Sequence, residues 1–320
     1  MTSTGTRHDV RLDDGRTLVV HDTGPVTGGG ARGGTGDGAG VGTARSSDGA
    51  PTLVWHHGSP QTGALLEPLV RATARRGMRL VSYGRPSYGG SSPLPGRDVG
   101  SAGRDVEQLA DALGLGRFAV MGSSGGGPHA LACAAALGDR VSGVVTFASP
   151  APYDGDEAWF AGMADDAALR AALRGREARA RFELTAEFDP GVFVDADRDA
   201  LAGPWAAMDD DVALAARAGS DGLVDDDVAL AHPWGFDLGQ VGAPVLVVHG
   251  EADRMIPVAH AHTLLRGCPR AELWLRPRDG HVSVLGGVPV ALDWLLDGAH
   301  DAAGGPSPGV HTAAAQDAHG

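Results

Sequence analysis

The stretch that most constrains this chain runs from Phe118 to Ala130 and reads F-A-V-M-G-S-S-G-G-G-P-H-A. Its first four residues are apolar and predict a short buried strand, and the alanine-rich run over 129–137 predicts a helix. Gly122, Ser124 and Gly126 form the pattern Gly-x-Ser-x-Gly between them. A serine on so sharp a turn takes a strained backbone conformation, and side chains at the two glycine positions would collide with the neighbouring strand or helix. The sequence therefore predicts a nucleophile elbow that presents Ser124.

Length and charge limit the classes of protein that this chain can belong to. A chain of 320 residues with 42% hydrophobic content can build one large α/β domain or a domain with an insert. Its net charge of −14 would repel nucleic acid and an anionic membrane surface. The sequence has no charged-then-apolar leader and no apolar stretch long enough for a bilayer. We therefore expect a cytoplasmic protein with neither nucleic acid nor membrane as partner.

The basic residues exclude several chemistries, because the sequence contains arginine but no lysine. A Walker-type phosphate loop, a Schiff-base lysine and a Ser-x-x-Lys site are therefore excluded. The formal dinucleotide pattern Gly28-x-Gly30-x-x-Gly33 is not followed by a helical pattern, so we interpret it as low-complexity sequence. We expect no cofactor.

Cysteine and aspartate patterns give no metal site. Cys133 and Cys268 are too few for a disulfide framework, and we expect both to be small buried hydrophobes. The triplets at 209–211 and 225–227 consist of aspartate, which we interpret as solvated helix starts rather than metal ligands. Since no His/Cys spacing indicates zinc, we predict that the protein binds no metal.

Strand and helix patterns alternate along most of the chain. Such alternation predicts an α/β fold with a mostly parallel sheet that is covered by helices on both faces. A hairpin is expected at 10–20, around Asp13-Asp14-Gly15. The expected later strands are 52–57, 79–83, 118–121, 141–148, 244–249 and 271–275, and the expected helices are 61–77, 98–113, 129–137, 258–266 and 284–296.

The alternation stops at Ser149 and resumes after Gly235. The segment 150–235 shows helical stretches without a convincing strand, and we predict that it forms a helical cap over the carboxyl edge of the sheet. The hydrolase-like core would then consist of 1–149 and 236–300. Within it, 24–50 is expected to be a glycine-rich mobile loop, and 301–320 a disordered tail.

Four short motifs, taken in order, resemble the α/β-hydrolase superfamily. They are His57-Gly58-Ser59-Pro60, the elbow at 122–126, Gly250-Glu251-Ala252-Asp253 and Gly280-His281. More narrowly, S-S-G-G-G-P-H-A-L-A-C and H-P-W-G-F-D-L resemble capped bacterial α/β-fold serine hydrolases. The resemblance covers nearly the whole chain outside the glycine-rich loop and the tail, and it implies an α/β-hydrolase fold with the chain order Ser, Asp, His.

Three residues match the catalytic positions that this resemblance implies. Ser124 would be the nucleophile, and His281, in a loop after an expected strand, would be the base that takes its proton. Asp253 would fix the imidazole tautomer. Asp253 could instead cap the helix that follows it, and Glu251 or Asp154 are the alternative acids.

The resemblance also implies an oxyanion hole, and the aromatic residues of the insert indicate where a pocket could lie. The backbone N–H groups of Ser59 and Gly125 would donate to the oxyanion. Aromatic residues of the insert fill its own core or line an apolar pocket, and Trp159 and Trp234 are the candidates for the pocket.

A serine elbow favours acyl transfer to water over alkyl-enzyme chemistry. We therefore expect a serine hydrolase that acts on a small apolar carboxylic ester or lactone. A cofactor-free perhydrolase and a C–C bond hydrolase would use the same triad, and a low-turnover ligand-binding or sensor protein could share the fold. The sequence specifies neither the acyl and alcohol groups nor the oligomeric state.

Overall fold

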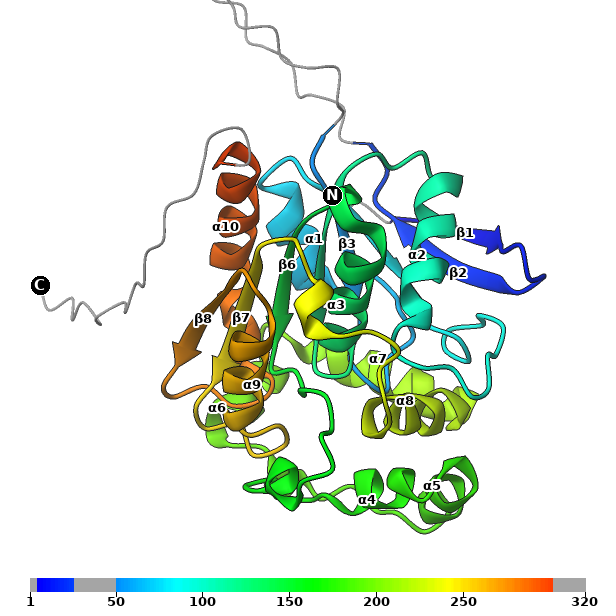
Figure 1. Ribbon diagram of the computed structural model, residues 1–320, viewed down its shortest axis with the longest axis vertical. Helices are drawn as coiled ribbons and strands as arrows, with labels where there is room; N and C mark the ends of the chain where they lie inside the picture. The colour runs from blue at the N-terminus through cyan, green and yellow to red at the C-terminus, as the bar shows by residue number, and fades with distance from the viewer. Residues whose placement is uncertain (1–4, 26–49, 302–320) are drawn as a thin grey trace, which may run out of the picture.

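The computed structural model of the protein describes residues 5–25 and 50–301. These residues form an eight-stranded sheet in the order β1-β2-β4-β3-β5-β6-β7-β8 (Figure 1). The strands are β1 (Thr6–Arg11), β2 (Thr17–Asp22), β3 (Thr52–His56), β4 (Arg79–Tyr83), β5 (Phe118–Ser123), β6 (Val141–Phe147), β7 (Val245–Gly250) and β8 (Ala271–Arg276).

Strand direction divides the sheet into two parts. β1 and β2 form an antiparallel hairpin, and β2 pairs antiparallel to β4. All pairs from β4 to β8 are parallel. The carboxyl ends of β3, β5, β6, β7 and β8 therefore lie along one edge, which is where open α/β sheets bind their ligands.

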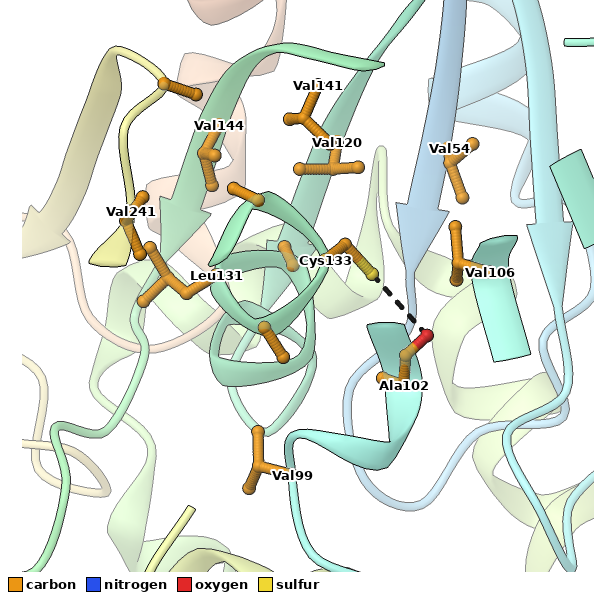
Figure 2. Close-up of a cluster of buried hydrophobic side chains, with 14 of the residues drawn as sticks. Val54, Val99, Ala102, Val106, Val120, Leu131, Cys133, Val141, Val144 and Val241 are labelled. Carbon is orange, nitrogen blue, oxygen red and sulfur yellow. Dashed lines mark hydrogen bonds between the residues drawn. The ribbon is translucent and has the colours of Figure 1, made fainter. Parts of the chain in front are cut away.

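Both faces of the sheet are apolar, as expected for parallel strands between helical layers. In β3, Val54 lies in one core cluster, whereas Leu53 and Trp55 lie in the other. Figure 2 shows the first cluster, in which Val54 and Val120 of the sheet face Cys133 and neighbouring helical residues. The alternation of side chains along each strand thus supplies two separate cores.

Helices cover these two faces and extend the molecule beyond the carboxyl edge of the sheet. α2 packs on α3, and α1 packs on α10. The helices are α1 (Glu67–Ala74), α2 (Ser101–Ala112), α3 (Gly126–Leu137), α4 (Ala167–Leu173), α5 (Arg176–Glu183), α6 (Asp195–Ala202), α7 (Ala206–Ala218), α8 (Asp221–Ala231), α9 (Ala259–Gly267) and α10 (Val288–Asp301).

The predicted α/β architecture is confirmed, and most of the expected elements appear close to their expected bounds. β4 coincides with the expected strand at 79–83, whereas the helix expected at 61–77 is only the shorter α1. Most of the glycine-rich segment 24–50 and of the tail 301–320, with Gly28, Gly30 and Gly33, lies outside the described residues.

The insert, defined here as residues 150–235, contains α4 to α8 and no strand within the part that the structure describes. These helices lie together in the lower part of Figure 1, beyond the sheet. Their position agrees with the expected helical insert. The division of the chain into core and cap domains stays a prediction.

Two further expectations concern cysteines and membrane spans. Cys133 and Cys268 are buried free thiols, as expected, and the Cys133 thiol lies 3.7 Å from the carbonyl oxygen of Ala102 (Figure 2). Burial raises the pKa of both thiols. Among the described residues, no helix is long and apolar enough to cross a bilayer.

The turn between β5 and α3 shows why its glycines are needed. A Cβ atom on Gly122 would lie 2.4 Å from the carbonyl oxygen of Gly126, and one on Gly126 would lie 2.1 Å from that of His56. Real Cβ atoms do not approach backbone oxygens so closely. The start of α3 therefore packs directly against the end of β3, as the sequence pattern predicted.

We predict that Gly126→Ala lowers the free energy of unfolding by about 1–3 kcal/mol or more, because the new methyl group forces the helix away from β3. Gly116→Ala is the matched control, because a Cβ at Gly116 meets nothing within 4 Å. Urea denaturation followed by circular dichroism measures both variants. Equal unfolding midpoints for the two would contradict the steric argument.

Candidate active site

Ser124 lies at the sharp turn after β5. Its φ of +51° is in the left-handed region, which non-glycine residues adopt rarely. The backbone N–H of Ser124 donates to the carbonyl oxygen of Phe147 at the end of β6 (2.8 Å). The side chain is partly exposed, although its neighbours on both sides are buried. The fold thus holds a strained serine at the carboxyl edge of the sheet and leaves its hydroxyl accessible.

Asp253 and His281 come from the loops after β7 and β8, and they meet. The Nδ1 atom of His281 lies 2.9 Å from Oδ2 of Asp253. The other oxygen, Oδ1, accepts from the backbone N–H groups of Met255 and Ile256, each at 2.9 Å. The carboxylate thus caps its own turn with one oxygen and holds the imidazole with the other. It does not cap the following helix α9, whose N-cap residue is Val258.

This contact determines the protonation of His281. An ionised carboxylate can only accept, so Nδ1 carries the hydrogen and Nε2 is free to accept a proton. Burial lowers the pKa of His281, but the charge and hydrogen bond of Asp253, together with the charge of Asp197, outweigh it. The pKa of His281 therefore lies above its ordinary value, which means that its protonated form is stabilised.

Backbone hydrogen bonds join the loops at this edge. The N–H of Ala148, after β6, donates to Val248 (3.1 Å), and that of Ala252 donates to Asp279 (3.0 Å). Together with the bond from Ser124 to Phe147, they connect the serine turn to the Asp253 and His281 loops. No hydrogen bond joins the Ser124 hydroxyl to His281 among the residues that the structure describes. The contact between these two residues stays a prediction.

The two expected oxyanion donors, Ser59 and Gly125, lie side by side. A Cβ atom on Gly125 would be 2.8 Å from Oγ of Ser59. The loop before Ser59 is fixed by Gly58, whose N–H donates to Oε1 of Gln61 (3.0 Å). Ser59 therefore lies against Gly125, the residue that follows Ser124, and a Cβ atom on Gly58 would lie 3.7 Å from Cβ of Ser124. The role of Ser59 and Gly125 toward an oxyanion stays a prediction.

Ser59 contacts a buried charged cluster centred on Asp226 of α8. The Asp226 carboxylate accepts from the Ser59 hydroxyl, from Tyr88 (3.0 Å), from Arg97 (2.5 Å) and from two nitrogens of Arg85 (2.6 and 3.3 Å). Asp226 and both guanidinium groups are almost fully buried. This cluster ties the insert to the loop that carries the candidate oxyanion donor.

The cluster carries a net positive charge. Burial opposes ionisation of Asp226, but Arg85 and Arg97 lower its pKa well below the usual range. Burial and the nearby Arg85 lower the pKa of His129 to about 3, so His129 is neutral. Two guanidinium groups thus face one carboxylate.

The expectation that the two aspartate triplets are solvated helix starts is wrong for four of the six residues. Asp225, Asp226 and Asp227 lie inside α8 and are 3%, 0% and 9% exposed, and Asp211 of α7 is also buried. Arg176 pairs with Asp225, and Arg179 with Asp227. The arginine-rich composition supplies partners that allow these carboxylates to be buried.

The expected pocket residues are both buried. Trp159 donates from Nε1 to the carbonyl oxygen of Ala151 (2.9 Å) and packs edge-on against His260. Trp234 is 2% exposed and belongs to the same core cluster as Val54 and Cys133. Their role as pocket residues stays a prediction.

The other candidates have simpler surroundings. The alternative acids Glu251 and Asp154 are exposed, and of the three candidate acids only Asp253 is hydrogen-bonded to the His281 ring. His57 is buried, donates from Nδ1 to Gly58 and accepts at Nε2 from the backbone of Arg85, so it braces this loop. The described residues contain no group of three His, Cys, Asp or Glu that could hold a metal ion.

Sequence reasoning missed Asp197 and the role of Asp226. Three consecutive aspartates on a helix project about 100° apart, so not all can face solvent when the helix is packed on both sides. This angular spacing of the three aspartates, together with an arginine, Arg85, just after a strand, is the signal that could have identified the cluster. Asp197 binds mostly backbone N–H groups, and no sequence signal marks such a contact.

Comparison with known proteins identifies the family. A sequence model described as alpha/beta hydrolase fold matches residues 51–288, which is more than half of the chain. The protein therefore belongs to the alpha/beta hydrolase fold family, as the motifs indicated.

Individual relatives agree with this family. The chain is 30% identical to a 2-hydroxy-6-oxononadienedioate/2-hydroxy-6-oxononatrienedioate hydrolase of Cupriavidus pinatubonensis, over 73% of this chain and 81% of the relative. The structure is similar to a bromoperoxidase from Bacillus anthracis (TM-score 0.66, 22% identity, 91% and 100% of the two chains). It is also similar to a thermophilic esterase from Thermogutta terrifontis (TM-score 0.64, 21% identity, 92% and 99%). These structures share the fold.

We predict that Asp226→Asn lowers the free energy of unfolding by about 3–5 kcal/mol, because it leaves two buried guanidinium groups without a counter-charge. Asp210→Asn removes the same charge from an exposed position of α7 and should change the free energy of unfolding by less than about 0.5 kcal/mol. Denaturant titration distinguishes them. A similar small effect in both variants would show that the cluster contributes little.

Proposed function

We propose that this protein is a serine hydrolase that cleaves a small carboxylic ester or lactone through an acyl-enzyme on Ser124. The observation that carries the proposal is the hydrogen bond between Asp253 and His281 at the same sheet edge as a strained, accessible serine. A carboxylate, an imidazole with a free Nε2 and a serine are the three groups that this chemistry requires. Membership of the hydrolase family supports an enzyme.

Each residue has a defined role in the proposed reaction. The Ser124 hydroxyl attacks the substrate carbonyl carbon while His281 Nε2 takes its proton, and Asp253 stabilises the resulting imidazolium. The oxyanion accepts hydrogen bonds from the backbone N–H groups of Ser59 and Gly125. The imidazolium then protonates the leaving alcohol oxygen as the C–O bond breaks. His281 then deprotonates a water molecule, which attacks the carbonyl carbon of the acyl-enzyme. The imidazolium returns this proton to Oγ of Ser124 as the bond between Oγ and the acyl carbon breaks, and the acid is released.

The substrate is proposed to be a small molecule, because the net charge of −14 disfavours polyanionic partners. An esterase among the similar structures supports ester chemistry on this fold. The 30% identical relative is named for hydrolysing an oxo-dienedioate, and this favours C–C bond hydrolysis as a second candidate function. The two functions share the triad and differ in the bond that is cleaved, so a substrate panel that contains both classes separates them.

We predict that Ser124→Ala lowers the kcat for p-nitrophenyl esters by at least about a thousandfold, because the variant has no nucleophile. It should also abolish labelling by a fluorophosphonate probe. Ser142→Ala, at the partly exposed start of β6, is the control and should react as the wild type does. Unchanged ester turnover in Ser124→Ala would refute the acyl-enzyme.

We predict a defined pH dependence. His281 acts as a base only when neutral, so kcat/KM should fall as the pH drops through a pKa above the ordinary value of about 6.5. Asp253→Asn removes the charge that raises this pKa, so the acid limb should move to lower pH while kcat falls by about 10⁴. Glu251→Gln is the matched control, since Glu251 is an exposed carboxylate two residues away. A full pH–rate profile of each variant measures the effect. An acid limb that stays at the same pH in Asp253→Asn would contradict the assignment.

A further inference from the structure

Three helices of the insert each place one buried aspartate on a loop of the core. Asp197 of α6, Asp211 of α7 and Asp226 of α8 are 1%, 9% and 0% exposed. Asp211 accepts from the backbone N–H (3.0 Å) and the hydroxyl of Thr62, and Asp226 accepts from Ser59. Asp197 binds the loop of His281. The insert thus contacts the core through carboxylates that are satisfied by core donors.

Asp197 accepts five hydrogen bonds. Its Oδ1 accepts from the backbone N–H groups of Val282 (2.9 Å) and Ser283 (2.8 Å) and from the Ser283 hydroxyl (2.8 Å). Its Oδ2 accepts from the backbone N–H of His281 (3.1 Å) and from that of Val194 (3.3 Å), at the start of its own helix. Three consecutive backbone N–H groups, beginning with that of His281, therefore converge on one carboxylate.

The contact leaves no room for a side chain at Gly280, which precedes His281. A Cβ atom on Gly280 would lie 2.1 Å from Oδ2 of Asp197, so a larger residue there would displace the carboxylate. The N–H of Gly280 donates to the Ser283 hydroxyl (2.8 Å), which closes the loop on itself. The backbone of His281 is thus fixed from the insert, while its ring is fixed by Asp253 in the loop after β7.

We propose that Asp197 is a positioning residue, through which the insert holds the His281 loop in the orientation that aims the imidazole between Asp253 and Ser124. The proposal rests on the proposed function, because it assigns Asp197 a purpose only if His281 is the base. Asp197 acts through the backbone of His281. A displacement of about 1 Å at a catalytic base can cost about a hundredfold in rate.

The effect of Asp197 on the pKa of His281 can be measured. Asp253 contacts the ring, His249 of β7 lies 3.7 Å from Asp253, and Asp279 on the same loop is paired with Arg276. Burial lowers the pKa of His281, whereas Asp253 and then Asp197 raise it. The loss of the Asp197 charge should therefore lower this pKa, so the acid limb reports the charge of Asp197, while a fall in kcat at constant KM reports its positioning role.

The test compares Asp197→Asn and Asp197→Ala. In Asp197→Asn the amide oxygen can still accept the three hydrogen bonds that Oδ1 accepts. The NH₂ group takes the place of Oδ2, and since it cannot accept a hydrogen bond, the backbone N–H of His281 loses its partner. We expect kcat to fall about tenfold in Asp197→Asn and about a hundredfold in Asp197→Ala, with KM changed by less than about twofold. The acid limb of kcat should move to lower pH by about 0.5 in Asp197→Asn.

Asp195→Asn is the matched control, because it removes the same charge from the same helix at a side chain that is 94% exposed. It should leave kcat and the pH profile unchanged. The proposal is overturned if Asp197→Asn keeps wild-type kcat and acid limb, or if both Asp197 variants change only the thermal unfolding midpoint.

A second measurement separates this proposal from the proposed function. The His281 imidazole is titrated by ¹⁵N NMR in Ser124→Ala, with and without Asp197→Asn, and its signal is assigned by its loss in His281→Asn. A lower pKa with Asp197→Asn supports the contact whatever Ser124 does. If Ser124→Ala still turns over ester, the function fails, whereas an unchanged NMR titration refutes only the role of Asp197.

Discussion

The buried carboxylate of Asp226 lies between Arg85 and Arg97, and this ion cluster holds the insert, the Ser59 loop and the sheet edge together. A carboxylate without water around it is stable only when its lone pairs are filled, and five hydrogen bonds fill them here. Removal of the Asp226 carboxylate would leave the two buried guanidinium groups of Arg85 and Arg97 without a counter-charge. The position of the candidate oxyanion donor thus depends on an electrostatic contact with a helix more than 160 residues away.

Much of the fold could be predicted from the sequence, because parallel strands buried on both faces appear as short apolar runs between turn residues. β4 and β5 are examples, and Gly122 and Gly126 identified the turn between strand and helix. The insert was recognised only as helical. Its packing depends on ion pairs between distant residues, such as Arg179 with Asp227, and no local pattern reports them.

The candidate site likewise contains residues that could be predicted from the sequence and residues that could not. Ser124, Asp253 and His281 could be predicted because each follows a strand, and parallel strands bring their carboxyl ends to one edge. The bond between Asp253 and His281 agrees with this reasoning. The buried aspartates were misread or missed, because whether a carboxylate faces solvent is decided by which helix packs over it. Asp197 could not be predicted, since the backbone N–H groups that it binds are present in every sequence.

The direction of the aspartates on α8 has a consequence for how such a protein can diversify. Asp225 and Asp227 pair with α5, and Asp226 pairs with the core, so the rotational phase of this helix is fixed at both of its neighbours. Loss or gain of one residue upstream within the helix would turn all three side chains by about 100°. The fold should therefore tolerate insertions and deletions in the connections between the other insert helices, but not within α8, because a change of length there would separate these aspartates from their partners.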